Sequence, residues 1–191
     1  GLFLNIVIEL MDRKNFSAVF VLLESHPLAF LENVLILTFF LSLCLFSKRR
    51  WFFGILIGTV WLGLGIANLY VLSYRVSPLS AIDFAILQLD WSFIGIYMSV
   101  PAFILLVIAV ILLLAGLVML FKKCPKSPVH RLFNTAVSVI LLCACIVIPY
   151  LPTSLGFGDN TYTDVIRLTE NYGFTYTFTR SLVDTGIDRP E

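Results

Sequence analysis

The sequence predicts an all-α, polytopic membrane protein with five transmembrane helices, an interfacial helix on the outer side and an extracytoplasmic C-terminal linker. The first observation is composition: 59% of the 191 residues are hydrophobic, 13% are charged, and the mean hydropathy is +0.96. Soluble domains carry about 45–50% apolar and about 25% charged residues, so water-soluble globular and disordered classes are excluded. A net charge of only +1 argues against nucleic acid as a partner. The second observation is that basic residues form two clusters that lie between long apolar segments.

The opening segment is apolar from Gly1 to Leu10, which is too short to cross a bilayer. Asn5 and Glu9 interrupt it, and no small-residue cleavage site follows, so it does not fit a secretory signal peptide. We expect it to be the second half of a transmembrane helix whose first half precedes Gly1.

Four further apolar segments are long enough to span about 30 Å of hydrocarbon. They run from about Leu28 to Ser47, from Trp51 to Tyr74, from Pro101 to Phe121 and from Leu132 to Leu151. Together with the opening helix they make five predicted spans.

Basic residues predict the orientation of these spans. One cluster is Lys48, Arg49 and Arg50, and the other is Lys122, Lys123, Lys126 and Arg131. Two spans separate the clusters, so both lie on one face, which the positive-inside rule makes cytoplasmic. The predicted topology is therefore N-terminus inside and C-terminus outside, with loops Asp12–Pro27 and Arg75–Val100 on the outer side.

The outer loop and the tail each contain a predicted helix. Ser80 with Asp83 three residues later resembles a capping box, and Ala81–Met98 fits an amphipathic helix in the outer interface. Residues 1–151 form the predicted transmembrane domain, and 152–191 form the linker. Within the linker, 163–168 predicts a short amphipathic helix capped by Thr163 or Asp164, whereas the pattern of 174–179 fits a strand or a helix.

Two sets of polar residues near the outer ends of the spans need an explanation. Asn5, Glu9 and Arg13 recur at intervals of four and share one helix face. A charge at the centre of a bilayer costs at least about 2.5–3.5 kcal/mol. One interpretation is an interfacial Glu9–Arg13 salt bridge that anchors the helix, and the other is the polar wall of a substrate groove.

The second set surrounds Arg75, which shares a face with Asn68 and is the only basic residue between Arg50 and Lys122. A guanidinium on the outer side suits a phosphate or a lipid headgroup. The alternative is that it pairs with Asp83 and pins the loop, and the two roles are compatible.

Several chemistries leave no signature in the sequence. There is no GxSxG, Walker loop or HExxH motif, and no Cys, His and Asp set with metal-ligand spacing. We therefore predict no catalytic residue and no metal site within this chain.

The sequence resembles the membrane domain of the lipoteichoic acid synthase family, which are sulfatase-like phosphoglycerol transferases of the alkaline phosphatase superfamily. The residues that carry the resemblance are Asn68, Arg75, Pro78, Asp83 and Phe84 after the Arg49–Arg50 turn, Asn5 with Glu9 and Arg13, His26–Pro27 with Phe30–Leu31, Asn171–Phe174 and Pro190–Glu191. The likeness extends over essentially the whole chain.

The resemblance implies a membrane domain that anchors an extracytoplasmic catalytic domain beginning beyond Glu191 and helps to present its lipid substrate. It implies a bacterial-type plasma membrane, a divalent metal such as manganese in the catalytic domain, and phosphatidylglycerol or a glycolipid as membrane partner. Arg75, Asn68, Glu9 and Asp83 would then contact or shape a headgroup site, with Pro78 shaping the loop.

Two other functions fit the same segments. A small transporter or flippase-like module would need polar residues near the bilayer midplane and internal repeats, which the third, fourth and fifth spans do not suggest. A purely structural anchor would use the outer polar residues only to satisfy one another.

Overall fold

The computed structural model describes residues 1–81, 83–84, 99–148 and 165–183, and every element in these ranges is helical. The helices are α1 (Leu2–Arg13), α2 (Phe16–Ser25), α3 (Pro27–Ser42), the 3₁₀ turn η1 (Leu43–Phe46), α4 (Arg50–Val71), α7 (Val100–Lys123), α8 (Arg131–Val147), α9 (Val165–Tyr172) and α10 (Phe174–Val183). The predicted interfacial helix Ala81–Met98 lies almost wholly outside the described residues.

Three of the helical segments are long and apolar enough to cross a membrane. They are Pro27–Phe46, which joins α3 and η1, then Arg50–Val71 and Val100–Lys123. The hydropathy of the sequence predicted all three within a few residues of their ends. The described helix α8 has 17 residues and coincides with most of the predicted segment Leu132–Leu151. The end of that segment, 149–151, lies outside the described residues.

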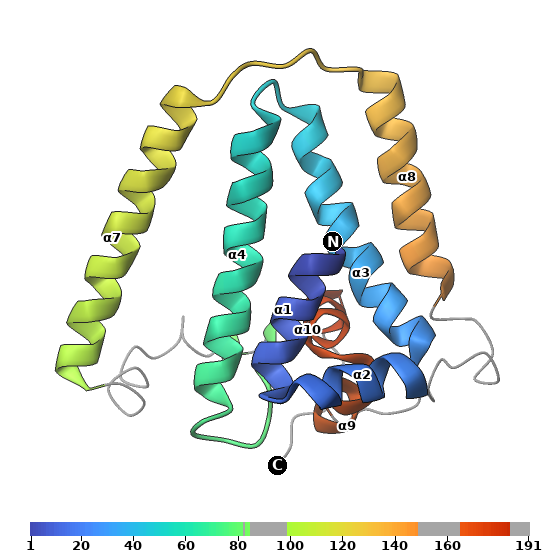
Figure 1. Ribbon diagram of the computed structural model, residues 1–191, viewed down its shortest axis with the longest axis vertical. Coiled ribbons are helices and arrows are strands. Elements are labelled where there is room, and N and C mark those ends of the chain that lie inside the picture. Colours follow the sequence, from blue (N-terminus) through green and yellow to red (C-terminus); the bar gives the residue numbers. More distant parts are fainter. Residues whose placement is uncertain (82, 85–98, 149–164, 184–191) are drawn as a thin grey trace.

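The long helices extend roughly along the long axis of the molecule, and the short helices lie together at one end (Figure 1). α3, α4, α7 and α8 extend between the two ends, with α7 apart from the others, and no described residue of α7 is buried. α2 lies across the lower end and packs on α1 and α3. We call this lower end the outer end, following the predicted topology, and the opposite end the basic end.

The segment Asp12–Pro27, which the sequence suggested was an outer loop, contains the helix α2. Asn15 caps it, because its Oδ1 accepts a hydrogen bond of 3.0 Å from the amide of Ser17. α2 buries Val19 and Leu22 but leaves Phe16 and Phe20 exposed. The sequence prediction treated this segment only as a connection between spans, because ten apolar residues are too few to cross a membrane.

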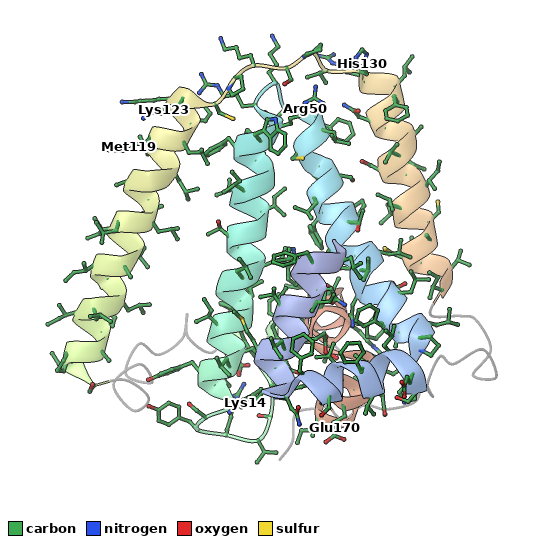
Figure 2. The ribbon with its side chains drawn as sticks, viewed as in Figure 1. Lys14, Arg50, Met119, Lys123, His130 and Glu170 are labelled. Carbon is green, nitrogen blue, oxygen red and sulfur yellow. The ribbon has the colours of Figure 1, made fainter. Side chains whose placement is uncertain are left out.

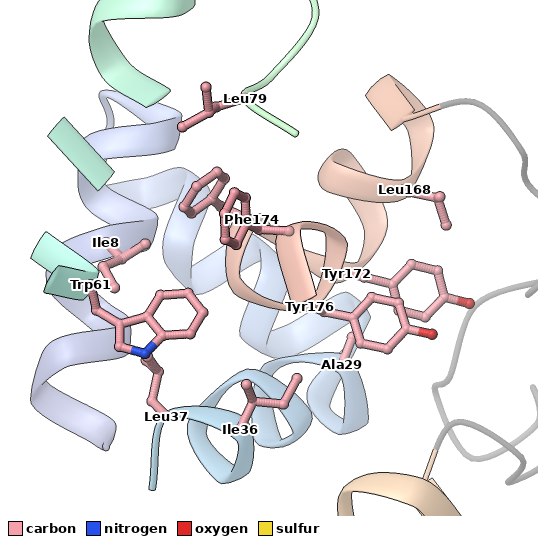
Figure 3. Close-up of a cluster of buried hydrophobic side chains, with 11 residues drawn as sticks. Ile8, Ala29, Ile36, Leu37, Trp61, Leu79, Leu168, Tyr172, Phe174 and Tyr176 are labelled. Atoms are coloured by element: carbon pink, nitrogen blue, oxygen red, sulfur yellow. The ribbon is translucent and has the colours of Figure 1, made fainter. Parts of the chain in front are cut away.

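The core brings the C-terminal helix into the bundle. α10 packs on α1 and α3, and the ring centroid of Phe178 lies 6.2 Å from that of Trp61 in α4. Figure 3 shows this cluster, in which Phe174 lies near Ile8 while Tyr172 and Tyr176 stack at 4.9 Å. The segment 174–179, for which the sequence allowed a strand or a helix, is a helix. Its first five residues, 174–178, are all buried.

Candidate functional site

The predicted site residues separate into two clusters at the outer end. Glu9 and Arg13 of α1, with Asn33 of α3, hold the corner between α9 and α10, and we call these three residues the clamp. Asn68, Arg75 and Asp83 hold the loop that follows α4, and we call them the loop brace. Each cluster is described in turn.

The charges of the clamp match the two helix ends that they meet. One oxygen of Glu9 accepts a 3.1 Å hydrogen bond from the amide of Phe174, the first residue of α10. The other oxygen pairs with Nε of Arg13 at 3.1 Å, and Nη2 of Arg13 donates to the carbonyls of Thr169 and Glu170 in the last turn of α9. A carboxylate at a helix N-terminus and a guanidinium at a helix C-terminus both interact favourably with the helix dipole.

Asn33 bridges the same two helix ends with a single buried amide. Its Nδ2 donates to the carbonyl of Tyr172 at 2.6 Å, and its Oδ1 accepts from the amide of Tyr176 at 2.8 Å. The residue is fully buried. Asn33 was not among the predicted site residues, and its only distinguishing feature in the sequence is its place beside Glu32 within an apolar run.

Gly173 is the turn between α9 and α10, and no other residue fits it well. Its φ is +87°, in the left-handed region, and its amide donates to the carbonyl of Thr169 at 2.9 Å. A Cβ on Gly173 would overlap Oε1 of Glu9 and would lie 2.5 Å from Nδ2 of Asn33. The clamp therefore closes around a position that has no side chain.

The loop brace starts from Asn68, which is 1% exposed. Its Nδ2 donates to Oδ1 of Asp12 at 2.6 Å, and its Oδ1 accepts from the amide of Leu79 at 2.7 Å. One side chain thus joins α1, α4 and the outer loop.

Arg75 closes the same loop on itself. Its Nη2 lies 2.5 Å from Oδ2 of Asp83, and its guanidinium also donates to the carbonyls of Ser77 and Pro78. Oδ2 of Asp83 further accepts from the amide of Ser80 at 2.8 Å, as the predicted capping box requires. The pairing of Arg75 with Asp83 and that of Glu9 with Arg13, both anticipated as alternatives from the sequence, are present in the structure.

Arg75 nevertheless keeps one side open. Its side chain is 33% exposed and faces a hollow of about 500 Å³ between the ends of α1 and α4. The hollow is lined by Asp12, Lys14, Leu72, Ser73, Tyr74, Arg75 and Val76. Two cations and one carboxylate meet at this shallow, open hollow. We call it the outer hollow.

The four residues predicted to bind a headgroup are therefore not brought together in one pocket. Of these, Arg75 lines the outer hollow, whereas Glu9 is fully buried in the clamp and Asn68 and Asp83 bind protein groups. Lys14, which the sequence analysis did not select, lines the hollow instead. Its φ of +53° places it in the left-handed conformation at the end of α1. This conformation was not predicted from the sequence.

Comparison with known proteins returns no relative: no family model, no curated protein and no solved structure matches the chain. Within the ranges described by the structure, no group of three or more His, Cys, Asp or Glu side chains is placed to hold a metal ion.

Proposed function

We propose that this chain is the membrane domain of a lipoteichoic-acid-synthase-like transferase of phosphoglycerol or a related headgroup. It anchors an extracytoplasmic catalytic domain that follows Glu191, sets the orientation of that domain and helps to present its lipid substrate. In this proposal the basic end faces the cytoplasm, five helices span a bacterial-type plasma membrane, and manganese belongs to the catalytic domain.

The observation that carries the proposal is the clamp. Three side chains of α1 and α3 make five hydrogen bonds to backbone groups of 169–176, about 140 to 165 residues later in the chain. Each such bond contributes about 0.5–1.5 kcal/mol, and bonds to charged groups contribute more. Because the contacts are to backbone groups at a helix corner, they hold the direction of α10, and with it the exit of the chain towards Glu191.

The outer hollow supports the lipid part of the proposal. The guanidinium of Arg75 suits a phosphate, and contacts with Ser77, Pro78 and Asp83 hold it in place without covering it completely. Lys14 supplies a second positive charge at the same hollow. A headgroup phosphate would bind between these two cations.

The test uses the longer protein that includes the sequence after Glu191, where we expect a sulfatase-like fold. Asn33→Leu removes two of the clamp contacts and should lower headgroup transfer from lipid in membranes. Turnover of a small water-soluble phosphodiester by the same protein should not change. Gly58→Ala in α4, where a Cβ would meet no atom within 4 Å, is the matched control. Equal loss of both activities, or no loss of either, would contradict an orienting role for the clamp.

A second function, a purely structural anchor, is favoured by the number of outer polar groups that already bind protein. Both oxygens of Glu9, both side-chain polar atoms of Asn68 and Oδ2 of Asp83 bind other groups of the chain. Mass spectrometry of lipid that co-purifies with the chain distinguishes the two functions. Less co-purified lipid in Arg75→Ala and in Lys14→Ala than in the wild type supports headgroup binding at the outer hollow, and equal amounts in all three support the anchor.

A further inference from the structure

The basic end carries charge of a single sign. Seven of the thirteen Lys and Arg residues of the chain belong to its two basic clusters, namely Lys48, Arg49, Arg50, Lys122, Lys123, Lys126 and Arg131. The sequence has no Asp or Glu from 33 to 82 or from 91 to 158. Figure 2 shows Arg50, Lys123 and His130 along this end, opposite Lys14 and Glu170.

A second hollow opens at this end, between η1 and the first turns of α4. It is lined by Cys44, Arg50, Trp51, Gly54 and Ile55, has a volume of about 310 Å³, and its wall is almost entirely apolar. We call it the basic hollow. Its volume lies at the lower end of the range for small-molecule sites.

The guanidinium of Arg50 is held at the basic hollow by a contact that leaves donors free. Its Nη2 donates to the carbonyl of Pro128 at 3.1 Å, and the amide of Ser127 donates to the carbonyl of Lys48 at 2.7 Å. These bonds join the two basic loops. Arg50 makes no other hydrogen bond or ion pair to the residues that the structure describes, so most of its five donors are available to a ligand.

Neighbouring groups at the start of α4 favour an anion with an apolar tail. No side chain caps the N-terminus of α4, where the helix dipole is positive. Trp51 is 65% exposed beside Arg50, and tryptophan prefers the headgroup level of a bilayer. Since no carboxylate lies at this end of the described chain, a positively charged choline or ethanolamine group would find no partner there.

We propose that the basic hollow binds one anionic phospholipid from the leaflet on the basic side of the membrane. An acyl chain lies along the wall at Gly54 and Ile55, and Arg50 binds the phosphate. This site lies at the opposite end from the clamp and the outer hollow, so it does not depend on the proposed transferase function.

The experiment places the full chain in nanodiscs that hold equal amounts of phosphatidylglycerol and phosphatidylcholine, then measures retained lipid by native mass spectrometry. The wild type should retain phosphatidylglycerol in preference to phosphatidylcholine. Arg50→Ala should reduce that preference about five-fold, as expected for one basic contact near a membrane surface. Lys126→Ala, which removes one charge from the same end but not from the hollow, is the control and should change it less than about two-fold.

A second pair of variants tests the acyl chain. Gly54→Leu places a side chain into the hollow and should reduce the preference for phosphatidylglycerol at least as much as Arg50→Ala does. Gly54→Ala, whose Cβ would lie 3.7 Å from Sγ of Cys44, should keep it. Circular dichroism and size-exclusion elution of each variant show whether it folds.

Three results would overturn the proposal, and the first needs no variant. They are a wild type without preference for phosphatidylglycerol, equal losses in Arg50→Ala and Lys126→Ala, and an unchanged preference in a folded Gly54→Leu. Should Arg50→Ala fail to fold, Arg50→Lys replaces it. Loss of the preference in Arg50→Lys, which keeps the charge, would indicate bidentate binding of the phosphate by Arg50, whereas an unchanged preference would indicate binding by charge alone.

Discussion

Replacing Gly173 by alanine tests the clamp most directly, because the structure provides two independent reasons for glycine. The backbone φ of +87° costs an L-residue about 1–2 kcal/mol. The added Cβ would overlap Oε1 of Glu9 and crowd Nδ2 of Asn33, and overpacking of a buried site costs about 1–3 kcal/mol. The sum, about 2–5 kcal/mol, lowers the stability of the docked α9–α10 corner at least about thirty-fold.

Hydrogen–deuterium exchange of the chain in nanodiscs measures this loss at the amides that the clamp binds. The amides of Phe174 and Tyr176 donate to Glu9 and Asn33, so they exchange when the corner leaves the clamp. We expect exchange of both to be at least about thirty-fold faster in Gly173→Ala, in proportion to the opening equilibrium.

The control is Gly63→Ala in α4, where a Cβ meets no atom within 4 Å and the helix gains propensity. Exchange at Phe174 and Tyr176 should be unchanged in this variant. Wild-type exchange rates in Gly173→Ala would refute the reasoning, because they would mean that the corner is not held in the conformation that only glycine adopts easily.

Three further predictions test other parts of the structure. Asn33→Leu removes the two buried hydrogen bonds that Asn33 makes to the carbonyl of Tyr172 and the amide of Tyr176, so we expect a loss of about 1–3 kcal/mol, measured by thermal unfolding against Asn33→Gln. Single cysteines are introduced as Lys126→Cys and Glu170→Cys after the native cysteines have been replaced. The cysteine at 126 should react with an impermeant maleimide only after permeabilisation, whereas the cysteine at 170 should react in intact cells. The reverse pattern would invert the topology. Ser138→Ala removes a 3.0 Å hydrogen bond to Ser42 between α8 and α3 and should cost only about 0.6 kcal/mol, so a loss above about 2 kcal/mol would contradict its role as an ordinary interhelical contact.

Interactions over short sequence distances were predictable. Glu9 and Arg13 are one helical turn apart, and Arg75 and Asp83 flank one short loop, so spacing alone suggested both ion pairs. The three helices that are long and apolar enough to cross a membrane were predictable for a different reason. A helix that crosses the hydrocarbon of a bilayer needs about twenty apolar residues, and its backbone groups form hydrogen bonds with one another. Both properties depend on consecutive residues, so they can be recognised in the sequence.

The partners of Asn33 could not be predicted in the same way. Its two hydrogen bonds reach Tyr172 and Tyr176, and an asparagine in an apolar run does not specify which distant backbone groups it binds. The same is true of α2, because its short apolar pattern fits a surface helix, a loop or part of a span until neighbouring helices are in place.

The sequence by itself determined that the chain is helical and apolar, where its long helices lie, and which end is basic. The tertiary structure decided that 174–179 is a helix, that this helix packs into the bundle, and that Glu9 serves the clamp while Lys14 joins Arg75 at the outer hollow. The physical reason is that helix formation and membrane insertion depend on local composition and period. The partner of a buried polar side chain depends instead on which backbone groups the packed helices leave unsatisfied beside it.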